Sequence, residues 1–105
     1  MASGKLGSAS LAATTNTTLY TCPASTVTAA TVLVCNTNAA SVTVRIGVGT
    51  GASPAAGDYV EYDSTIPAYG VLERGALVLT AGEKIFVYAS TTGVNVRANG
   101  YEEAV

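Results

Sequence analysis

The sequence predicts an all-β protein: a single-domain antiparallel β-sandwich or jelly-roll-like barrel of about eight short strands. Three observations support this fold class. Apolar and polar residues alternate with a period of two in several segments. Turn-forming residues interrupt these segments about every ten residues, and no segment has the pattern of an amphipathic helix. The 105 residues have room for one such domain.

The clearest predicted strand covers residues 41–48. Its three valines and Ile46 share one face, as in a half-buried antiparallel strand. Residues 31–35 are almost entirely apolar and predict a strand buried on both faces. We expect residues 36–40 to form the loop between them, because its asparagines tolerate a left-handed backbone.

The second half of the chain repeats this plan. Residues 84–89 and 94–98 predict two strands joined by a loop at 90–93. Residues 58–63 and 71–79 predict two more, the second kinked or bulged near its glycine. A long surface loop is expected at 49–57, and weaker strands nearer the N-terminus at 7–12 and 17–22.

The domain organisation follows from these segments. We expect residues 1–15 to form an N-terminal arm or edge strand, and residues 16–105 to form the β-sandwich domain. The segment from Ala2 to Leu11 is rich in Ser and Gly and has one charge, on Lys5. Such a segment is a poor autonomous strand, so we expect it to become ordered against a neighbouring molecule.

Charge is sparse in this chain. Charged residues make up 11% of the sequence, against about 25% in an average protein. Either partners cover much of the surface, or Thr, Ser and Asn supply its polarity. The net charge of −2 and the scattered basic residues argue against nucleic-acid binding. Because no apolar run of signal-peptide or membrane-span length is present, we expect an intracellular product with no membrane partner.

The sequence offers little to an enzyme. It contains no His, which removes the commonest general base and metal ligand. The two cysteines, Cys22 and Cys35, cannot complete a four-ligand zinc site, and in a reducing compartment we expect buried free thiols rather than a disulfide. The glycines of residues 47–51 lack the Lys and the helix of a phosphate-binding loop. We therefore predict no catalytic or metal-binding residue, no cofactor and no small-molecule substrate.

Three carboxylates come close together in the sequence, at Asp58, Glu61 and Asp63. Glu61 and Asp63 are expected on one face of a strand, where they could hold a calcium ion with loop carbonyls. The alternative is a solvated strand face whose charge discourages edge pairing. We favour the second interpretation because the ligand count is too low for a strong calcium site.

The six tyrosines point to contacts between proteins, because tyrosine is enriched where protein surfaces meet. A sugar-binding platform is the alternative, which we favour less because the chain has no Trp and its tyrosines do not cluster in the sequence. Arg45 and Arg97 occupy matching positions in two predicted hairpins and are expected to pair with carboxylates, within the chain or across a subunit boundary. The predicted interface residues are Lys5, Leu6, Leu11, Tyr59, Tyr62, Tyr69, Arg74 and Tyr101.

Several segments resemble small virion proteins of tailed bacteriophages, in particular cyanophages. The similarity begins with the run N-T-T-L-Y-T-C-P at residues 16–23, where the family type has Val in place of Cys22. It continues through four further segments, at residues 53–63, 70–74, 81–84 and 100–103. These are structural rather than catalytic motifs, and they span most of residues 16–103.

The resemblance implies a structural protein of the virion, assembled in the host cytoplasm. The expected role is a capsid decoration, or cement, protein that binds the major capsid protein on the head exterior, as a homotrimer. One alternative is a component of the tail, neck, baseplate or fibre attachment. Another is a carbohydrate-binding β-sandwich module that recognises the host.

Overall fold

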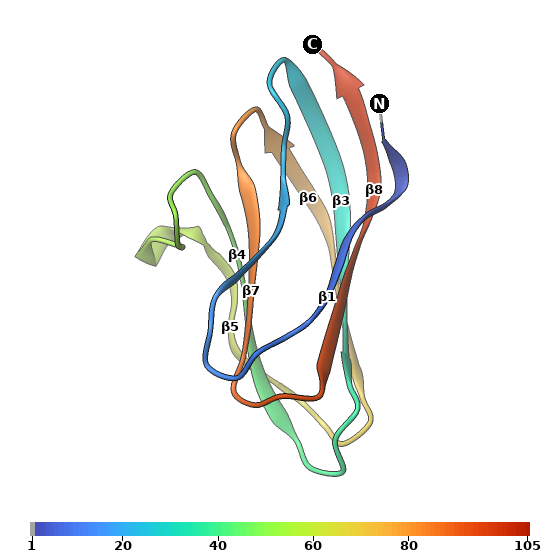
Figure 1. Ribbon diagram of the computed structural model, residues 1–105, viewed down its shortest axis with the longest axis vertical. Coiled ribbons are helices and arrows are strands. Elements are labelled where there is room, and N and C mark those ends of the chain that lie inside the picture. The colour runs from blue at the N-terminus through green and yellow to red at the C-terminus, as the bar shows by residue number, and fades with distance from the viewer. Residues whose placement is uncertain (1) are drawn as a thin grey trace.

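The computed structural model describes residues 2–105 and confirms the all-β prediction, with two four-stranded antiparallel sheets packed face to face (Figure 1). Sheet A has the order β1-β8-β3-β6, and sheet B has the order β2-β7-β4-β5. The strands are β1 (Ser3–Ser10), β2 (Thr17–Thr21), β3 (Thr26–Asn36), β4 (Val42–Gly49), β5 (Tyr59–Ile66), β6 (Val71–Thr80), β7 (Lys84–Ala89) and β8 (Val94–Ala104).

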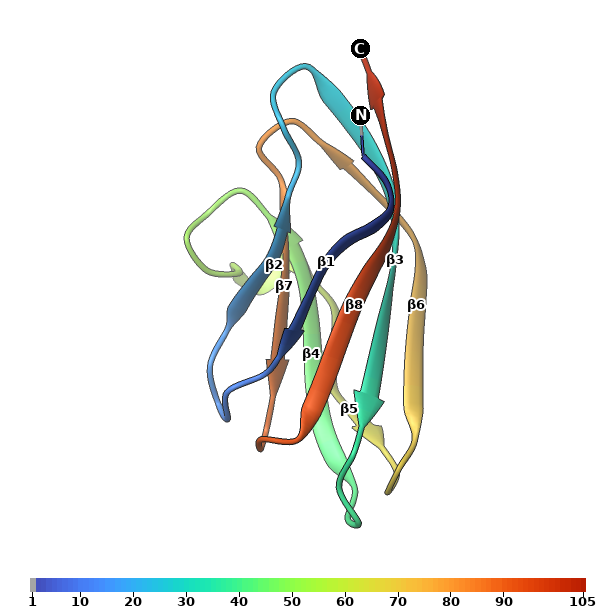
Figure 2. The ribbon, with the colours of Figure 1, turned by 45° about the vertical axis from the view of Figure 1, so that its right-hand side comes forward.

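The strand order is that of a jelly roll. The first strand pairs with the last, β2 with β7, β3 with β6, and β4 with β5. The chain thus resembles one long hairpin wound into two layers, which is the double Greek key of this architecture. Both termini lie at one end of the sandwich (Figure 2), and the connections β3–β4, β5–β6 and β7–β8 lie at the other (Figure 1).

The core is a single layer of aliphatic side chains between the sheets. Burial alternates along all of β3, and along β4 as far as Ile46. The expectation that residues 31–35 are buried on both faces is therefore wrong, because Leu33 is half-buried and Cys35 is exposed on the outer face of sheet A. Small β-branched residues suit the inward positions because they pack closely on a pleated surface. The largest fully buried aliphatic members of the core are Val32, Val34, Val44, Ile46, Ile66, Leu79, Ile85, Val87 and Val94.

Two strands, β3 and β8, are much longer than the sequence predicts. The strand expected at 31–35 begins at Thr26, because Thr26 and Thr28 are buried and face inward despite their polarity. The strand expected at 94–98 continues as β8 to Ala104. It passes Gly100, where a Cβ would lie closer than 3.0 Å to the backbone of Ala29, so only glycine allows the β3–β8 pairing to continue.

The bulge expected near Gly75 is present in β6. The register between β3 and β6 shifts between Ala30 and Val32, and Ala76 has a φ of 58°. A positive φ is uncommon for a residue with a side chain and marks local backbone strain. The bulge sets the two halves of β6 at different registers along β3.

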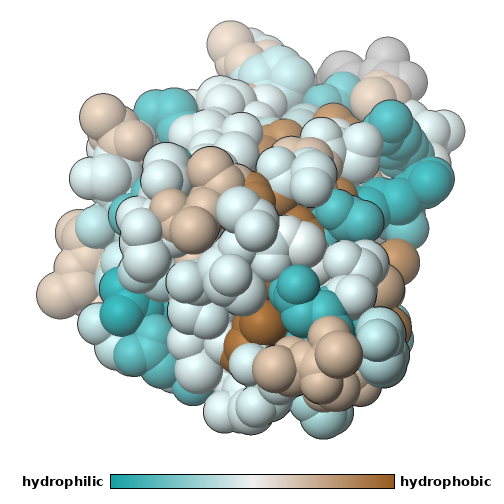
Figure 3. All heavy atoms as spheres, turned by 60° about the horizontal axis from the view of Figure 1, so that its bottom comes forward, coloured by the Kyte–Doolittle hydropathy of each residue, from teal (hydrophilic) through white to brown (hydrophobic). Residues whose placement is uncertain are grey.

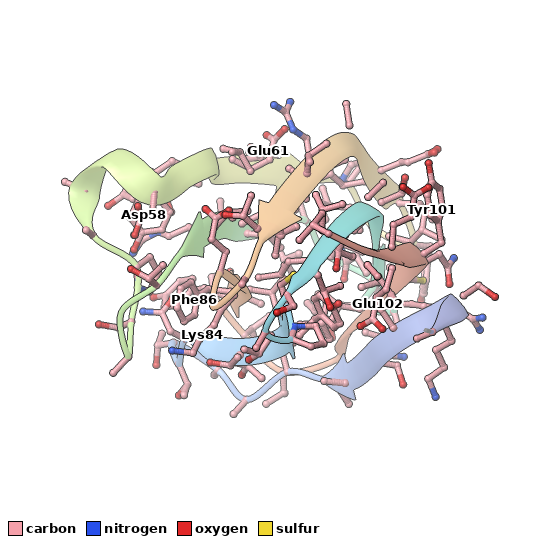
Figure 4. All side chains as sticks on the ribbon, turned by 90° about the horizontal axis from the view of Figure 1, so that it is seen from above. Asp58, Glu61, Lys84, Phe86, Tyr101 and Glu102 are labelled. Atoms are coloured by element: carbon pink, nitrogen blue, oxygen red, sulfur yellow. The ribbon has the colours of Figure 1, made fainter. Side chains whose placement is uncertain are left out.

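The long loop between β4 and β5 folds back onto the outer face of sheet B. It ends in a single 3-10 turn, η1 (Ala56–Asp58). Gly47 and Gly49 on β4 make room for it, because a Cβ on either would press against Pro54 or Asp58 of the loop. Phe86 pairs with Gly47 and is buried although it lies outside the main core cluster. The view from above shows Phe86 and Lys84 on the side where this loop folds back (Figure 4).

The N-terminal segment is an edge strand of its own chain. From Ser3 to Ser10 it pairs with β8, so the expectation that it orders against a neighbouring molecule is wrong. Leu11 is buried in the core. Met1, the first residue of the predicted arm, lies outside the described residues. At Gly7 the strand runs so close to β2 that a Cβ would come within 3.0 Å of the Leu19 carbonyl oxygen.

Replacing Gly7 with Ala should therefore separate the edges of the two sheets. We expect Gly7→Ala to lower the free energy of unfolding by about 1–3 kcal/mol, the usual cost of inserting a methyl group where there is no space. The matched control is Gly57→Ala, because a Cβ there would meet no atom within 4 Å. Urea denaturation should place the control within about 0.5 kcal/mol of the parent. Equal stability of the two variants would contradict the close approach at Gly7.

Candidate functional site

The structure does not gather the predicted interface residues onto one surface. Leu11 is buried in the core of its own chain, so it offers no surface to a partner. Leu6 packs against that core and is half-buried. Lys5 is exposed on β1. Arg74 of β6 lies at the gap between the sheets, where it pairs with Glu61 of β5. The remaining four residues, which lie on three different parts of the molecule, are Tyr59, Tyr62, Tyr69 and Tyr101.

One of these parts is the end of the sandwich at the bottom of Figure 1, which we call the lower end and define as residues 36–41, 66–70 and 90–93. Asn36 is fully buried there, and its side-chain nitrogen lies within 3.3 Å of the carbonyl oxygens of Ala40, Ile66 and Pro67. Its side-chain oxygen accepts a hydrogen bond from the backbone of Asn38. One buried amide thus joins two loops, which the sequence did not reveal.

A second asparagine extends this network to the third loop. The Asn38 side chain donates to the carbonyl of Thr92 over 2.9 Å, and Gly93 leaves the space that this side chain occupies. The Asn38 carbonyl also accepts a hydrogen bond from the Tyr69 backbone. The buried and part-buried bonds of Asn36 are costly to leave unmade. With the exposed Asn38–Thr92 bond, they hold the three loops in a fixed arrangement.

Tyr69 projects from this fixed end. It is 70% exposed, and its backbone has a φ of 57°, a conformation that disfavours bulky side chains. Val71, two residues further on, is 65% exposed. A large side chain that is both strained and solvent-exposed contributes nothing to the core. Such strain is found where a residue has a function outside the fold.

A second part of the molecule is an aromatic cluster on the outer face of sheet B, around Arg45. The guanidinium carbon lies 4.3 Å from the centre of the Tyr62 ring and 4.5 Å from that of Tyr88. Tyr59 meets Tyr62 edge to face with 4.9 Å between ring centres. Arg45 also donates to both carboxylate oxygens of Asp63. We call Arg45, Tyr59, Tyr62, Asp63 and Tyr88 the Arg45 cluster.

This cluster depends on a β-bulge. Between the pairs Val44–Ser64 and Ile46–Glu61 the register of β4 and β5 shifts, so that Tyr62 and Asp63 together face Arg45. Asp63 has a φ of 51° as part of this irregularity. The absence of clustering among tyrosines in the sequence was therefore misleading, because the cluster forms across two strands.

The bulge also separates the two carboxylates that were expected on one face. Glu61 faces the gap between the sheets, where it accepts from Ser64 over 2.6 Å and from Arg74 of β6 over 3.4 Å. Asp63 lies on the outer face with Arg45. The expectation of a shared face is wrong, and each carboxylate already has a cationic partner. Among residues 2–105 no group of three or more metal-ligating side chains is present.

The third part is the outer face of sheet A. Its outward apolar side chains come from the three strands β8, β3 and β6. Val78 and Tyr101 are 64% and 52% exposed, whereas Val27, Ala29 and Leu33 of β3 are half-buried. Two adjacent open hollows, of about 200 and 220 Å³, lie between these strands. We define the sheet A face by the outward residues that line them or adjoin them, which are Val27, Ala29, Thr31, Leu33, Ala76, Val78 and Tyr101.

A polar cluster closes the opposite, upper end of the sandwich. Tyr20 donates to Glu102 over 2.5 Å, and its hydroxyl lies 2.7 Å from that of Thr28. Glu102 and Tyr101 lie on opposite sides of β8 (Figure 4). Burial and the hydrogen bond to Glu102 raise the pKa of Tyr20 to about 12. The bond from Tyr20, with one from the Ala2 backbone, lowers the pKa of Glu102. A protonated Tyr20 thus links β2 to β8.

The sequence also predicted the state of the two cysteines and an ion pair for Arg97. Both cysteines are free thiols; Cys22 is buried as expected, but Cys35 is exposed. Arg97 forms no ion pair within the described chain and donates to Asn99 over 2.6 Å.

Seen toward the lower end, most of the surface is pale, with teal and brown confined to patches (Figure 3). Residues of intermediate hydropathy, rather than charges, cover this view. No helix within residues 2–105 has the length and hydrophobicity to cross a membrane.

Comparisons with protein-family models, with curated proteins and with solved structures found no match to this chain.

The Tyr20–Glu102 bond predicts a pH dependence of stability. The folded state lowers the pKa of Glu102, so its contribution is present above the pKa of the unfolded chain and is lost as the pH falls through the folded value. We expect Glu102→Gln to melt at a lower temperature than the parent at pH 6, and to lose less stability between pH 6 and pH 3. Thermal unfolding followed by circular dichroism measures both. Glu103→Gln, on the opposite face of β8, controls for the lost charge. If Glu102→Gln lost as much stability as the parent between pH 6 and pH 3, the prediction would be contradicted.

Proposed function

We propose that the protein is a virion structural component of a tailed bacteriophage, most specifically a capsid decoration protein. In this role it binds the major capsid protein on the head exterior after assembly in the host cytoplasm. Both the resemblance in the sequence and the jelly-roll fold support this proposal. The homotrimer is implied by the resemblance alone. Fold alone does not define function, so the surfaces of the molecule have to support it.

The observation that carries the proposal is the fixed lower end with its projecting tyrosine. The buried amide of Asn36 and the side chain of Asn38 order three loops before any partner binds. Preorganised loops lose little conformational freedom on binding, which leaves more of the contact energy for affinity. Tyr69 then offers the type of side chain that most often dominates protein interfaces.

The mechanism of a decoration protein follows from such a surface. Each copy would bridge neighbouring capsid subunits through its lower end, without chemical reaction. Many copies on one shell share the outward force of packaged DNA, so modest single contacts are sufficient. The same surface would also serve a tail, neck or baseplate component. Copy number separates the two, because a decoration protein is present in hundreds of copies per particle and a tail component in few.

Replacement of Tyr69 by Gly tests this proposal without harming the fold. Glycine adopts a positive φ freely, so Tyr69→Gly should be as stable as the parent or slightly more stable. We expect its affinity for matching empty capsids to fall about tenfold or more, the usual loss on truncating a central interface tyrosine. Co-sedimentation with capsids measures this affinity.

The matched control is Ser25→Gly, which relieves a φ of 54° in an exposed turn at the upper end. It should bind capsids like the parent. Failure of the parent protein to bind capsids, or equal binding by both glycine variants, would overturn the proposed role of the lower end. Capsids that lack the protein should also lose their DNA at a lower temperature than complete ones.

The Arg45 cluster favours a second candidate function, a carbohydrate-binding module. Tyr62 is 58% exposed, and its neighbours Tyr59 and Arg45 hold it in place. Fixed aromatic rings provide apolar surface on which a sugar ring can stack, with Asp63 and Arg45 as nearby polar groups. For this function we expect Tyr62→Ala to abolish binding on a glycan array while Tyr69→Gly retains it. An array without any signal for the parent protein would eliminate this candidate.

A further inference from the structure

The sheet A face combines exposed apolar side chains with charges that form no ion pair within residues 2–105. Arg97 on β8 and Glu73 on β6 both point outward, and neither forms an ion pair within the described chain. The pairing register places both beside Leu33 of β3, one on each side. An unpaired cation and an unpaired anion therefore flank the central strand of this face at the same level.

The apolar residues follow the same arrangement four residues away along β3. Ala29 of β3 lies between Val78 on β6 and Tyr101 on β8. The two hollows are lined by these residues and their neighbours. A two-fold axis that runs along β3 exchanges β6 with β8. It would therefore bring each charge opposite its counterion and each Tyr101 opposite a Val78.

We infer that the sheet A face binds a second copy of this chain across a two-fold axis parallel to β3. In such an isologous interface the same patch is used twice. Arg97 of each copy pairs with Glu73 of the other, Tyr101 fills the hollow beside Val78, and Leu33 packs on its own symmetry mate. Sheets in protein sandwiches stack in this way about 10 Å apart. The inference rests on this face alone and does not require the proposed capsid role.

The register also shows that this arrangement brings no like charges together. Glu103 would lie opposite Thr80, and Asn95 opposite Val71. Lys5 on β1 lies beyond the three strands that overlap. A two-fold pair differs from the trimer that the resemblance implies. It also directs both lower ends the same way, because the strands of the two copies run parallel.

An alternative two-fold stacking has its axis in the plane between the two faces, perpendicular to the strands and level with Gly100. The two β8 strands would then run antiparallel, with Arg97 opposite Glu103 of the second copy. The two lower ends would point in opposite directions. Charge reversal distinguishes the arrangements, since Arg97 has a different partner in each.

The first experiment measures mass by light scattering as a function of concentration. The parent chain of 10.5 kDa should reach twice this mass. We expect Arg97→Glu and Glu73→Arg to raise the dissociation constant about tenfold or more, and the double variant to restore pairing. Lys5→Glu, outside the overlap, should pair like the parent. Because these residues are exposed, circular dichroism should show all variants folded.

The second experiment uses the natural thiol of Cys35, which points outward from β3, while Cys22 is buried. Near the proposed axis, the two copies of Cys35 lie about 10 Å apart, so a short bismaleimide should link them. In the antiparallel stacking they are ten residues apart along the strands, about 34 Å. Cys35→Ser should abolish the cross-link.

A monomer at every concentration up to about 1 mM, a trimer, or a dimer whose affinity Arg97→Glu leaves unchanged would each overturn the inference. A dimer of the antiparallel kind would also overturn it. In that dimer Cys35 gives no cross-link, and the affinity lost in Arg97→Glu is restored by Glu103→Arg rather than by Glu73→Arg. All of these measurements are made without capsids. Their outcome is therefore independent of whether Tyr69 binds a shell.

Discussion

The structure depends on one geometric constraint: every second side chain of eight strands must fit into a single layer between two sheets. That layer is about 10 Å thick, and small aliphatic side chains such as those of Val32 and Val44 fill it completely. The outward side chains are free of this demand. The three surfaces differ because different local irregularities shape them.

Alternation in the sequence was sufficient to predict the fold class and the centres of most strands. It failed at the ends of β3 and β8 for two physical reasons. Thr28 faces the core because its hydroxyl contacts Tyr20 and Cys22 there, which no pattern of apolar residues reveals. Gly100 reads as an interruption, yet it is the residue that lets β8 stay paired with β3. Long-range neighbours, rather than local propensity, decided both cases.

The candidate surfaces were less predictable than the fold. Tyr69 could be identified from its residue type, but its exposure and strain depend on loops tied together by Asn36. The Arg45 cluster was invisible because a bulge in β5 places Tyr62 and Asp63 opposite one residue of β4. A one-residue slip moves side chains to the other face of a sheet. For that reason the shared face expected of Glu61 and Asp63 was wrong, and a bulge of this kind has no dependable sequence signal.

The sheet A face and the lower end are related through the direction of the strands. The axis proposed for the pair runs along β3, so the two lower ends lie on the same side of a dimer. A surface that met both would be bound at two points, and the second contact would form at the high effective concentration set by the first. A weakly charged protein gains from this arrangement, because it has few charges with which to attract a partner over long range. Its sparse charges are then used at short range, where Arg97 and Glu73 would fix the register of two otherwise apolar faces.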